Sequence, residues 1–157
     1  MVMRVSDALD GSVVVRPAWG TFEATVDQLV DRLVAGGRLV QAQATKAAQR
    51  IREREAIAGT AMVDIGVSIP HARIDGVDGT VAAMAVSPGA VYEVGAGLPI
   101  SIVVLVLSSP ELAGEHLNFL SGVSHLLQSV RMRERLRHAR DVDEVIELVR
   151  GTELSRS

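Results

Sequence analysis

The segment Ile100–Leu107 restricts the fold of this chain more than any other part of its sequence. Every residue in it except Ser101 is apolar. A strand with one face in water alternates apolar and polar residues, whereas a strand covered on both faces is apolar nearly throughout. The stretch Leu98–Leu107 is about half as long as the ~20 residues that a membrane-spanning helix needs. The segment therefore predicts a central strand of an α/β protein, with helices packed on both faces of its sheet.

The remaining segments alternate between helical and extended patterns in an order that fits this architecture. The predicted strands are Gly66–Ile69, Thr80–Val86 and Ile100–Leu107. The predicted helices are residues 21–35 with Thr21 as N-cap, Gln41–Ile57, a helix after Pro110 with the apolar stripe Leu117, Leu120, Val123, Leu127 and Val130, and Val142–Arg150 with a capping-box start at Asp141 and Glu144. We therefore predict one α/β domain with a sheet between helices, and loose termini at Met1–Arg4 and Thr152–Ser157.

The composition excludes several classes of function. The chain has 157 residues, a net charge of −3 and only 3% aromatic residues, which argues against nucleic-acid binding by a basic surface or by base stacking. It has no cysteine, so disulfides, thiolate metal sites and cysteine nucleophiles are excluded. Residues 1–12 lack the charged-then-apolar pattern of a secretion signal. We expect a soluble, cytoplasmic protein without membrane insertion.

The stretch GVSIPHARIDGV, residues 66–77, places His71 directly after Pro70. Proline has no backbone N–H, so Pro70 is expected to end the preceding strand and to expose the next residue. A neutral imidazole has a free ring nitrogen near pH 7 and is a competent nucleophile that can carry a phosphoryl group. Arg73 lies two residues further on, within reach of an anion on His71. Taken alone, the segment favours an ordinary loop histidine.

Other candidate residues are Arg54 and His116. Arg54 in IREREAIAGT either belongs to a solvated, charged helix end or binds phosphate through its planar guanidinium. His116 in AGEHLNFLSGVSHLL either lies on a helix surface or points at the strand ends. His125 gives a weaker indication, and RMRERLRHAR around His138 is typical of a solvated face. No H-x-x-x-H or carboxylate cluster supports a metal site, and the GxxxxGK(S/T) and G-x-S-x-G motifs are absent.

Three ordered blocks resemble the enzyme IIA domain of the bacterial phosphoenolpyruvate-dependent phosphotransferase system, in its fructose/mannitol and nitrogen-regulatory class. REREAIAGT supplies Arg54, Glu55 and Thr60 of an R-E…T pattern, and GVSIPHAR fits a G-x-x-I-P-H signature. VVLVLSSPELAGEHLNFLSGVSHLL combines a strand with H-L-x-x-L at the opening of a helix, and RERLRHARDVDEVIELV is similar to the closing helices of the family. The resemblance covers residues 3–150 as one enzyme IIA domain and leaves residues 151–157 as a C-terminal tail.

The resemblance implies a fold, a reaction and a set of roles. The fold is a mixed β-sheet sandwiched by helices (α/β/α). His71 is the phosphoryl acceptor, His116 orients its ring or contacts the phosphoryl group, and Arg54 binds the anion, with Arg73 beside it. The donor is the histidine phosphocarrier protein, itself phosphorylated by enzyme I. The receiver is an enzyme IIB partner, or a regulatory target protein that senses the phosphorylation state. No cofactor or metal is implied.

Several alternatives stay open. A chain without a fused IIB or membrane IIC segment favours the nitrogen-regulatory type over the sugar-specific type. The alternatives to a carrier are a non-catalytic regulatory interaction domain and a degenerate anion-binding domain. The degenerate form is suggested by TAMVDIG, where the family is glycine-rich, so that Ala61–Ile65 would rim the site differently. We also expect an apolar docking ring around His71 that includes Ile69, Pro70 and Ala72, although Ile69 is equally compatible with the core.

Overall fold

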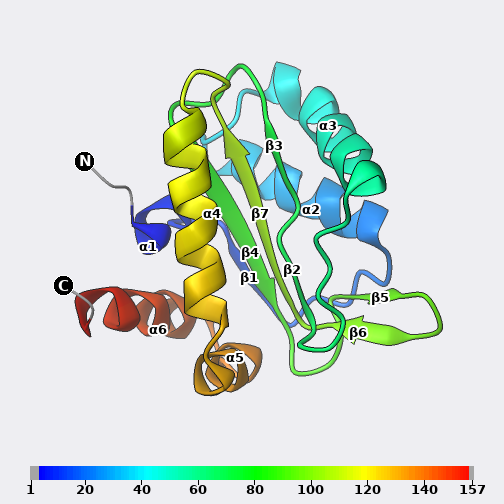
Figure 1. The fold of residues 1–157 in the computed structure, drawn as a ribbon, viewed down its shortest axis with the longest axis vertical. Helices are drawn as coiled ribbons and strands as arrows, with labels where there is room; N and C mark the ends of the chain where they lie inside the picture. The colour runs from blue at the N-terminus through cyan, green and yellow to red at the C-terminus, as the bar shows by residue number, and fades with distance from the viewer. Residues whose placement is uncertain (1–3, 156–157) are drawn as a thin grey trace.

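The computed structural model describes residues 4–155 and contains a central five-stranded sheet (Figure 1). In spatial order the strands are β1 (Val13–Val15), β4 (Thr80–Val86), β7 (Ile102–Ser108) and, along the far edge of β7, β2 (Val67–Ser68) followed by β3 (His71–Arg73). β7 pairs antiparallel with β4 and parallel with both β2 and β3, while β1 pairs parallel with β4. The mixed sheet implied by the family resemblance is therefore confirmed. A separate two-stranded ribbon consists of β5 (Tyr92–Val94) and β6 (Leu98–Ile100).

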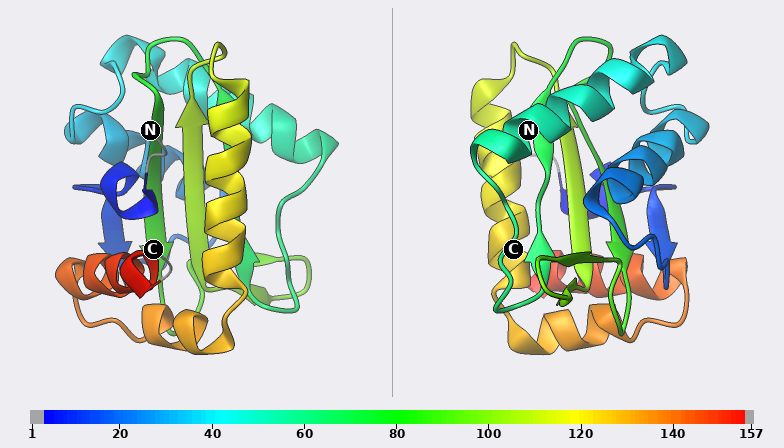
Figure 2. Two further views of the ribbon diagram at one scale, coloured as in Figure 1. Left: turned by 60° about the vertical axis from the view of Figure 1, so that its left-hand side comes forward. Right: turned by 90° about the vertical axis from the view of Figure 1, so that its right-hand side faces the viewer.

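Helices cover both faces of the sheet, as predicted. In the right-hand view of Figure 2, α4 (Ala113–Leu127) lies on one side of the sheet and α2 (Phe22–Ala35) on the other, while α3 (Ala44–Ile57) runs diagonally in front of the sheet edge. No helix within residues 4–155 is long and apolar enough to span a membrane. On the first face lie α1 (Val5–Ala8), α4 (Ala113–Leu127), α5 (Val130–Arg137) and α6 (Val142–Ser155), and on the second lie α2 (Phe22–Ala35) and α3 (Ala44–Ile57), which follows the short 3₁₀ helix η1 (Gln41–Gln43).

The apolar residues of β7 pack against both helical layers. Val104 and Val106 belong to the core cluster that contains residues of α4 and α6, whereas Val103, Leu105 and Leu107 belong to the cluster that contains residues of α2 and α3. Because successive side chains of a strand point to opposite faces, a strand between two helical layers needs apolar residues at every position. All residues of β7 are buried.

The buried face of α4 differs from the predicted stripe. Leu117 is 66% exposed, and Val130 is 67% exposed and begins α5 instead of ending α4. The residues of α4 that are buried are His116, Phe119, Val123, Leu126 and Leu127. The prediction was right for the buried Val123 and Leu127 but wrong for Leu117 and Val130, because apolar residues occur around much of this helix and only packing against the sheet selects the face that is covered.

The strand β2 ends before Pro70, in line with the sequence prediction, but the chain then stays beside β7 instead of leaving the sheet. The Pro70 carbonyl accepts a hydrogen bond from the Val106 N–H at 2.9 Å, and β3 begins with His71, directly after the proline. Pro70 has no N–H to donate to β7, and the regular pairing is interrupted at residues 69 and 70, between β2 and β3. His71 therefore stands at the start of a strand that continues along the same edge of β7.

Both helix starts that were predicted from capping residues are present. Thr21 Oγ1 accepts from the Ala24 N–H at 3.1 Å, and Asp141 Oδ1 accepts from the Glu144 N–H at 2.8 Å. α6 continues to Ser155, and Glu153 accepts from the Ser6 N–H at 3.1 Å, so the expectation of a loose chain from residue 152 was wrong for residues 152–155. The other terminal residues for which looseness was expected, 1–3, 156 and 157, lie outside the described part of the chain.

The observed buried face of α4 predicts that two leucines of this helix contribute very differently to the free energy of unfolding. Leu127→Ala removes a side chain that is 1% exposed and should lower the free energy of unfolding by about 2–5 kcal/mol. Leu117→Ala removes one that is 66% exposed and should change it by about 0.5 kcal/mol or less. Urea unfolding of both variants measures this difference, and a larger loss for Leu117→Ala would restore the stripe predicted from the sequence.

Candidate functional site

The four residues selected from the sequence come together around one small pocket. Arg54 lies in the last turn of α3, His71 and Arg73 begin and end β3, and His116 lies in the first turn of α4. In Figure 1, β3 runs along the edge of the sheet between α3 and α4. The pocket has a volume of about 110 Å³ and is lined by Arg54, His71, Ala72, Arg73, His116, Leu117 and Leu120.

The hydrogen bonds of His71 determine which of its ring nitrogens is free. Nδ1 lies 2.7 Å from the carbonyl oxygen of Ile69. A carbonyl can only accept, so Nδ1 carries the proton and Nε2 carries the lone pair. Arg54 donates its Nε–H to that lone pair at 3.0 Å. Nε2 is therefore the nucleophilic atom of this ring, and a guanidinium already lies against it.

The surroundings of His71 keep its ring neutral. Burial lowers the pKa of His71 most, and the nearby Arg54 guanidinium lowers it further, while the hydrogen bond to Ile69 acts in the opposite direction. Burial and a neighbouring cation both disfavour the imidazolium form. The lone pair on Nε2 is consequently available at neutral pH.

Glu55 and Thr60 hold the backbone of Ile69, the residue whose carbonyl orients His71. The Thr60 hydroxyl donates to Glu55 at 2.9 Å and accepts from the Ile69 N–H at 3.2 Å, and the Thr60 N–H donates to Glu55 at 2.8 Å. The Ile69 residue that these contacts fix then receives Nδ1–H of His71 through its carbonyl. The R-E…T pattern in the sequence contained both residues, but only the fold reveals this contact with the histidine segment.

His116 is held on the other side of the pocket. Its Nδ1 lies 2.6 Å from Ser108 Oγ, and its ring centroid lies 5.5 Å from that of His71 at an interplanar angle of 52°. Burial lowers its pKa to about 4, with further lowering by His71, Arg73 and Arg54. Sequence reasoning missed Ser108 and its neighbour Thr80. Each is a hydroxyl residue at one end of an otherwise apolar strand, Thr80 at the start of β4 and Ser108 at the end of β7, and this pattern could have identified them.

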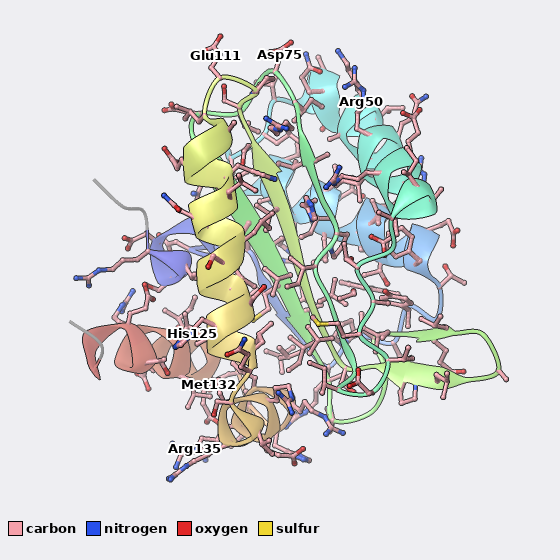
Figure 3. All side chains as sticks on the ribbon, in the orientation of Figure 1. Arg50, Asp75, Glu111, His125, Met132 and Arg135 are labelled. Carbon is pink, nitrogen blue, oxygen red and sulfur yellow. The ribbon has the colours of Figure 1, made fainter. Side chains whose placement is uncertain are left out.

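The remaining histidines and the basic segment lie away from this pocket. Figure 3 shows His125 near the opposite end of α4 from His116, and Arg135 pointing outward from α5. His138 lies 3.6 Å from Glu134 on the surface, with 62% of its side chain exposed. The described residues contain no group of three or more His, Cys, Asp or Glu side chains that could hold a metal ion.

The apolar docking ring differs from the one expected. Ile69 and Ala72 are only 7% and 5% exposed, and Pro70 is also buried. The prediction was therefore wrong for Pro70 and Ala72, whereas Ile69 takes the core position that the sequence left open. Ile69 belongs to the core cluster that contains residues of α4, and Ala72 to the cluster that contains residues of α2 and α3. The exposed apolar side chain that lines the pocket is instead Leu117 from α4, at 66% exposure.

The segment Ala61–Ile65 lies apart from the histidines. The Met62 N–H donates to the Val67 carbonyl at 2.7 Å, and the Val67 N–H returns a bond to Met62, which closes a tight turn before β2. Val63 and Ile65 line a different pocket, together with residues of α5. Ala61–Ile65 therefore does not form the rim of the histidine pocket.

A family model described as "Phosphoenolpyruvate-dependent sugar phosphotransferase system, EIIA 2" matches residues 10–151. The chain belongs to this family. Members are phosphotransferase components that carry a phosphoryl group, so the resemblance deduced from the three sequence blocks is confirmed.

Two curated EIIA relatives have moderate sequence identity. The chain is 30% identical to the fructose-specific EIIABC component of Bacillus subtilis over 128 residues, which are 81% of this chain and 20% of that protein. It therefore spans about a fifth of the length of that relative. It is 32% identical to the fructose-specific EIIA component of Haloferax volcanii over 120 residues, which are 76% of each protein.

Solved EIIA structures share the fold. Nitrogen regulatory protein IIA-Ntr from Neisseria meningitidis aligns with a TM-score of 0.75 at 22% identity, over 92% of this chain and 98% of that one. Enzyme IIA of the Escherichia coli mannitol system, solved in complex with phosphorylated enzyme IIB, aligns with a TM-score of 0.72 at 21% identity, over 90% and 95%. At this level of identity the likeness concerns the fold.

The pKa of His116 predicts how the stability of this EIIA protein depends on pH. In the folded chain the pKa is about 4, below the ordinary value of 6.5, so the unfolded chain binds the proton more tightly. The stability that neutral His116 provides is complete above about pH 6.5 and is lost as the pH falls towards 4. The urea midpoint should fall over this range less steeply in His116→Gln than in the native protein. Equal pH dependence in the two proteins would contradict a buried, neutral His116.

Proposed function

We propose that this EIIA protein is a histidine phosphoryl carrier that accepts a phosphoryl group on Nε2 of His71. The observation that carries the proposal is the fixed tautomer of His71. With Nδ1–H committed to the Ile69 carbonyl, the lone pair on Nε2 lies in a pocket lined by two arginines. This is the arrangement that nucleophilic attack on an anionic phosphoryl group requires.

The transfer balances without any change of protonation at His71. The lone pair on Nε2 forms a new N–P bond while the N–P bond of the donor's phosphohistidine breaks and its electron pair returns to the donor imidazole. Nδ1 keeps its proton and its bond to Ile69, so the phosphorylated ring remains a good leaving group for the second transfer. Arg54 would exchange its contact with Nε2 for one with a phosphoryl oxygen, and Arg73 adds positive charge at the rim.

The partners follow from this role. The donor in our proposal is the histidine phosphocarrier protein, charged by enzyme I from phosphoenolpyruvate. The proposed receiver is an enzyme IIB protein, which is supported by the complex of the mannitol IIA protein with phosphorylated IIB. The fructose-specific names of both curated relatives support a sugar-uptake partner. A nitrogen-regulatory role, with the phosphorylation state as the signal, remains the prediction made from the sequence, as does a cytoplasmic location.

The degenerate and purely regulatory alternatives receive less support. The degenerate form was suggested by the altered segment TAMVDIG, yet Ala61–Ile65 lines a pocket separate from His71. A domain without transfer chemistry has no use for a neutral histidine whose free nitrogen is oriented by a carbonyl and contacted by a guanidinium.

The decisive experiment is phosphorylation by phosphoenolpyruvate, enzyme I and the histidine phosphocarrier protein, read as an acid-labile mass increase of one phosphoryl group. We expect label on the native protein and none on His71→Ala, because only Nε2 of His71 acts as the acceptor. His125→Ala is the matched control and should be labelled like the native chain, since His125 lies at the far end of α4. Label on His71→Ala, or none on the folded native protein, would refute the carrier proposal.

Arg54 should control the rate of this transfer. Arg54→Gln removes the guanidinium beside Nε2 and should slow phosphorylation about 100-fold, the loss typical of one donor that stabilises transition-state charge. Arg54→Lys should recover part of the rate, because it keeps the charge but not the planar fork. The matched control is Arg50→Gln, one turn earlier on α3, where Figure 3 shows the side chain pointing outward. Stopped-flow or quenched-flow labelling measures these rates, and equal slowing by both Gln variants would argue against a specific role of Arg54.

A further inference from the structure

A chain of three polar side chains lies behind His116. Glu115 Oε1 is 3.2 Å from Thr80 Oγ1, Thr80 Oγ1 is 3.2 Å from Ser108 Oγ, and Ser108 Oγ is 2.6 Å from His116 Nδ1. Thr80 and Ser108 are fully buried and directly opposite each other, where β4 and β7 pair. Buried hydroxyls are costly unless they are hydrogen-bonded. The carrier reaction described above gives these three residues no role.

The positions of the hydroxyl hydrogens follow from the carboxylate at one end. An ionised carboxylate can only accept, so Thr80 donates its hydrogen to Glu115. Thr80 must then accept a hydrogen bond from Ser108, because the two oxygens would repel each other if no hydrogen lay between them. Ser108 has thereby used its hydrogen and must accept from Nδ1–H of His116. The lone pair of His116 is left on Nε2, the nitrogen that this chain does not use.

We propose that Glu115, Thr80 and Ser108 are positioning residues that fix His116 as the Nδ1–H tautomer and allow it to take up a proton on Nε2 when His71 carries a phosphoryl group. The second half of this inference rests on the proposed function. The proton comes from water, and the ring becomes an imidazolium with two N–H groups. Nε2–H then donates to a phosphoryl oxygen, and Nδ1–H donates through the two hydroxyls towards the Glu115 carboxylate.

The charges around His116 explain why uptake depends on the phosphoryl group. Before phosphorylation, burial and the neighbouring His71, Arg73 and Arg54 all disfavour the imidazolium form and keep the pKa near 4. Among the described residues, Glu115 is the carboxylate that the hydrogen bonds of Thr80 and Ser108 link to the His116 ring. Glu55, the other carboxylate close to the site, is bound by Thr60. A phosphoryl dianion on His71 offsets the positive charge of the two arginines and thereby favours protonation.

The tautomer can be measured without any phosphorylation. Imidazole ¹⁵N NMR of the native protein at pH 7 should show His116 as Nδ1–H. In Thr80→Val, Ser108 loses its acceptor, so its hydrogen turns to Nδ1 and the ring should change to the Nε2–H form. Glu115→Gln retains an oxygen acceptor for Thr80 and should keep the native tautomer. Glu111→Gln, on an exposed side chain at the top of Figure 3, is the matched control and should change nothing.

Two results would overturn the positioning role: a native His116 in the Nε2–H form, or a Thr80→Val protein that keeps Nδ1–H. The amide ¹H–¹⁵N spectrum establishes that each variant is folded. If Thr80→Val does not fold, Ser108→Ala replaces it, because without the serine oxygen nothing in the described chain holds Nδ1–H and the ring should again change tautomer.

The proton uptake is tested on the phosphorylated protein. The pKa of His116 should rise by about one unit or more on phosphorylation, as expected for an opposite charge within contact range. Glu115→Gln should reduce this rise and slow transfer to an enzyme IIB acceptor about tenfold, an effect typical of removing the partner behind a working imidazole. Glu111→Gln should do neither. An unlabelled His71 would refute the proposed function and leave the tautomer result standing, whereas a labelled protein with an unchanged His116 pKa would refute only the proton uptake.

Discussion

The whole arrangement depends on β7 being covered on both faces and paired on both edges. Its antiparallel pairing with β4 places Ser108 opposite Thr80, and its parallel pairing with β3 places Val106 beside His71. α4 follows β7 after a short turn, so His116 is fixed relative to the same strand. The two histidines therefore face each other because both are positioned by one buried strand. Close packing of such a strand between two helical layers leaves little freedom for either ring to move.

The two histidines are anchored through the same nitrogen but by different acceptors. His71 uses Nδ1 towards a backbone carbonyl, whereas His116 uses Nδ1 towards a hydroxyl chain that ends at a carboxylate. The carbonyl fixes the tautomer, and its raising effect on the pKa of His71 is outweighed by burial, which suits a nucleophile that must stay neutral. A chain ending in a negative charge also stabilises the protonated ring, which suits a group that responds to an anion. Both anchors include a glutamate bound by a threonine, Glu55 with Thr60 near His71 and Glu115 with Thr80 near His116.

The sequence was sufficient for the architecture and for the four residues around the pocket. The apolar run of β7 predicted two covered faces, and the I-P-H segment with its flanking blocks located Arg54, His71, Arg73 and His116. The exposed face of α4, the burial of Pro70 and Ala72, and the Thr80–Ser108 contact were not predicted. Each of these depends on which strand registers and helix faces meet in space, and one-dimensional periodicity does not contain that information.

The charge distribution links the two states of the site. Arg54 and Arg73 would bind a phosphoryl group, and the same two cations lower the pKa of His116, while Arg54 also lowers that of His71. The features that attract the anion therefore also keep the nucleophile unprotonated before the anion arrives. Once the anion is present, its charge offsets that of the arginines, and the Glu115 carboxylate then favours the protonated form of His116. In our proposal, a proton at His116 is thus a consequence of phosphorylation, and the hydroxyl chain from Glu115 determines how strongly that proton is held.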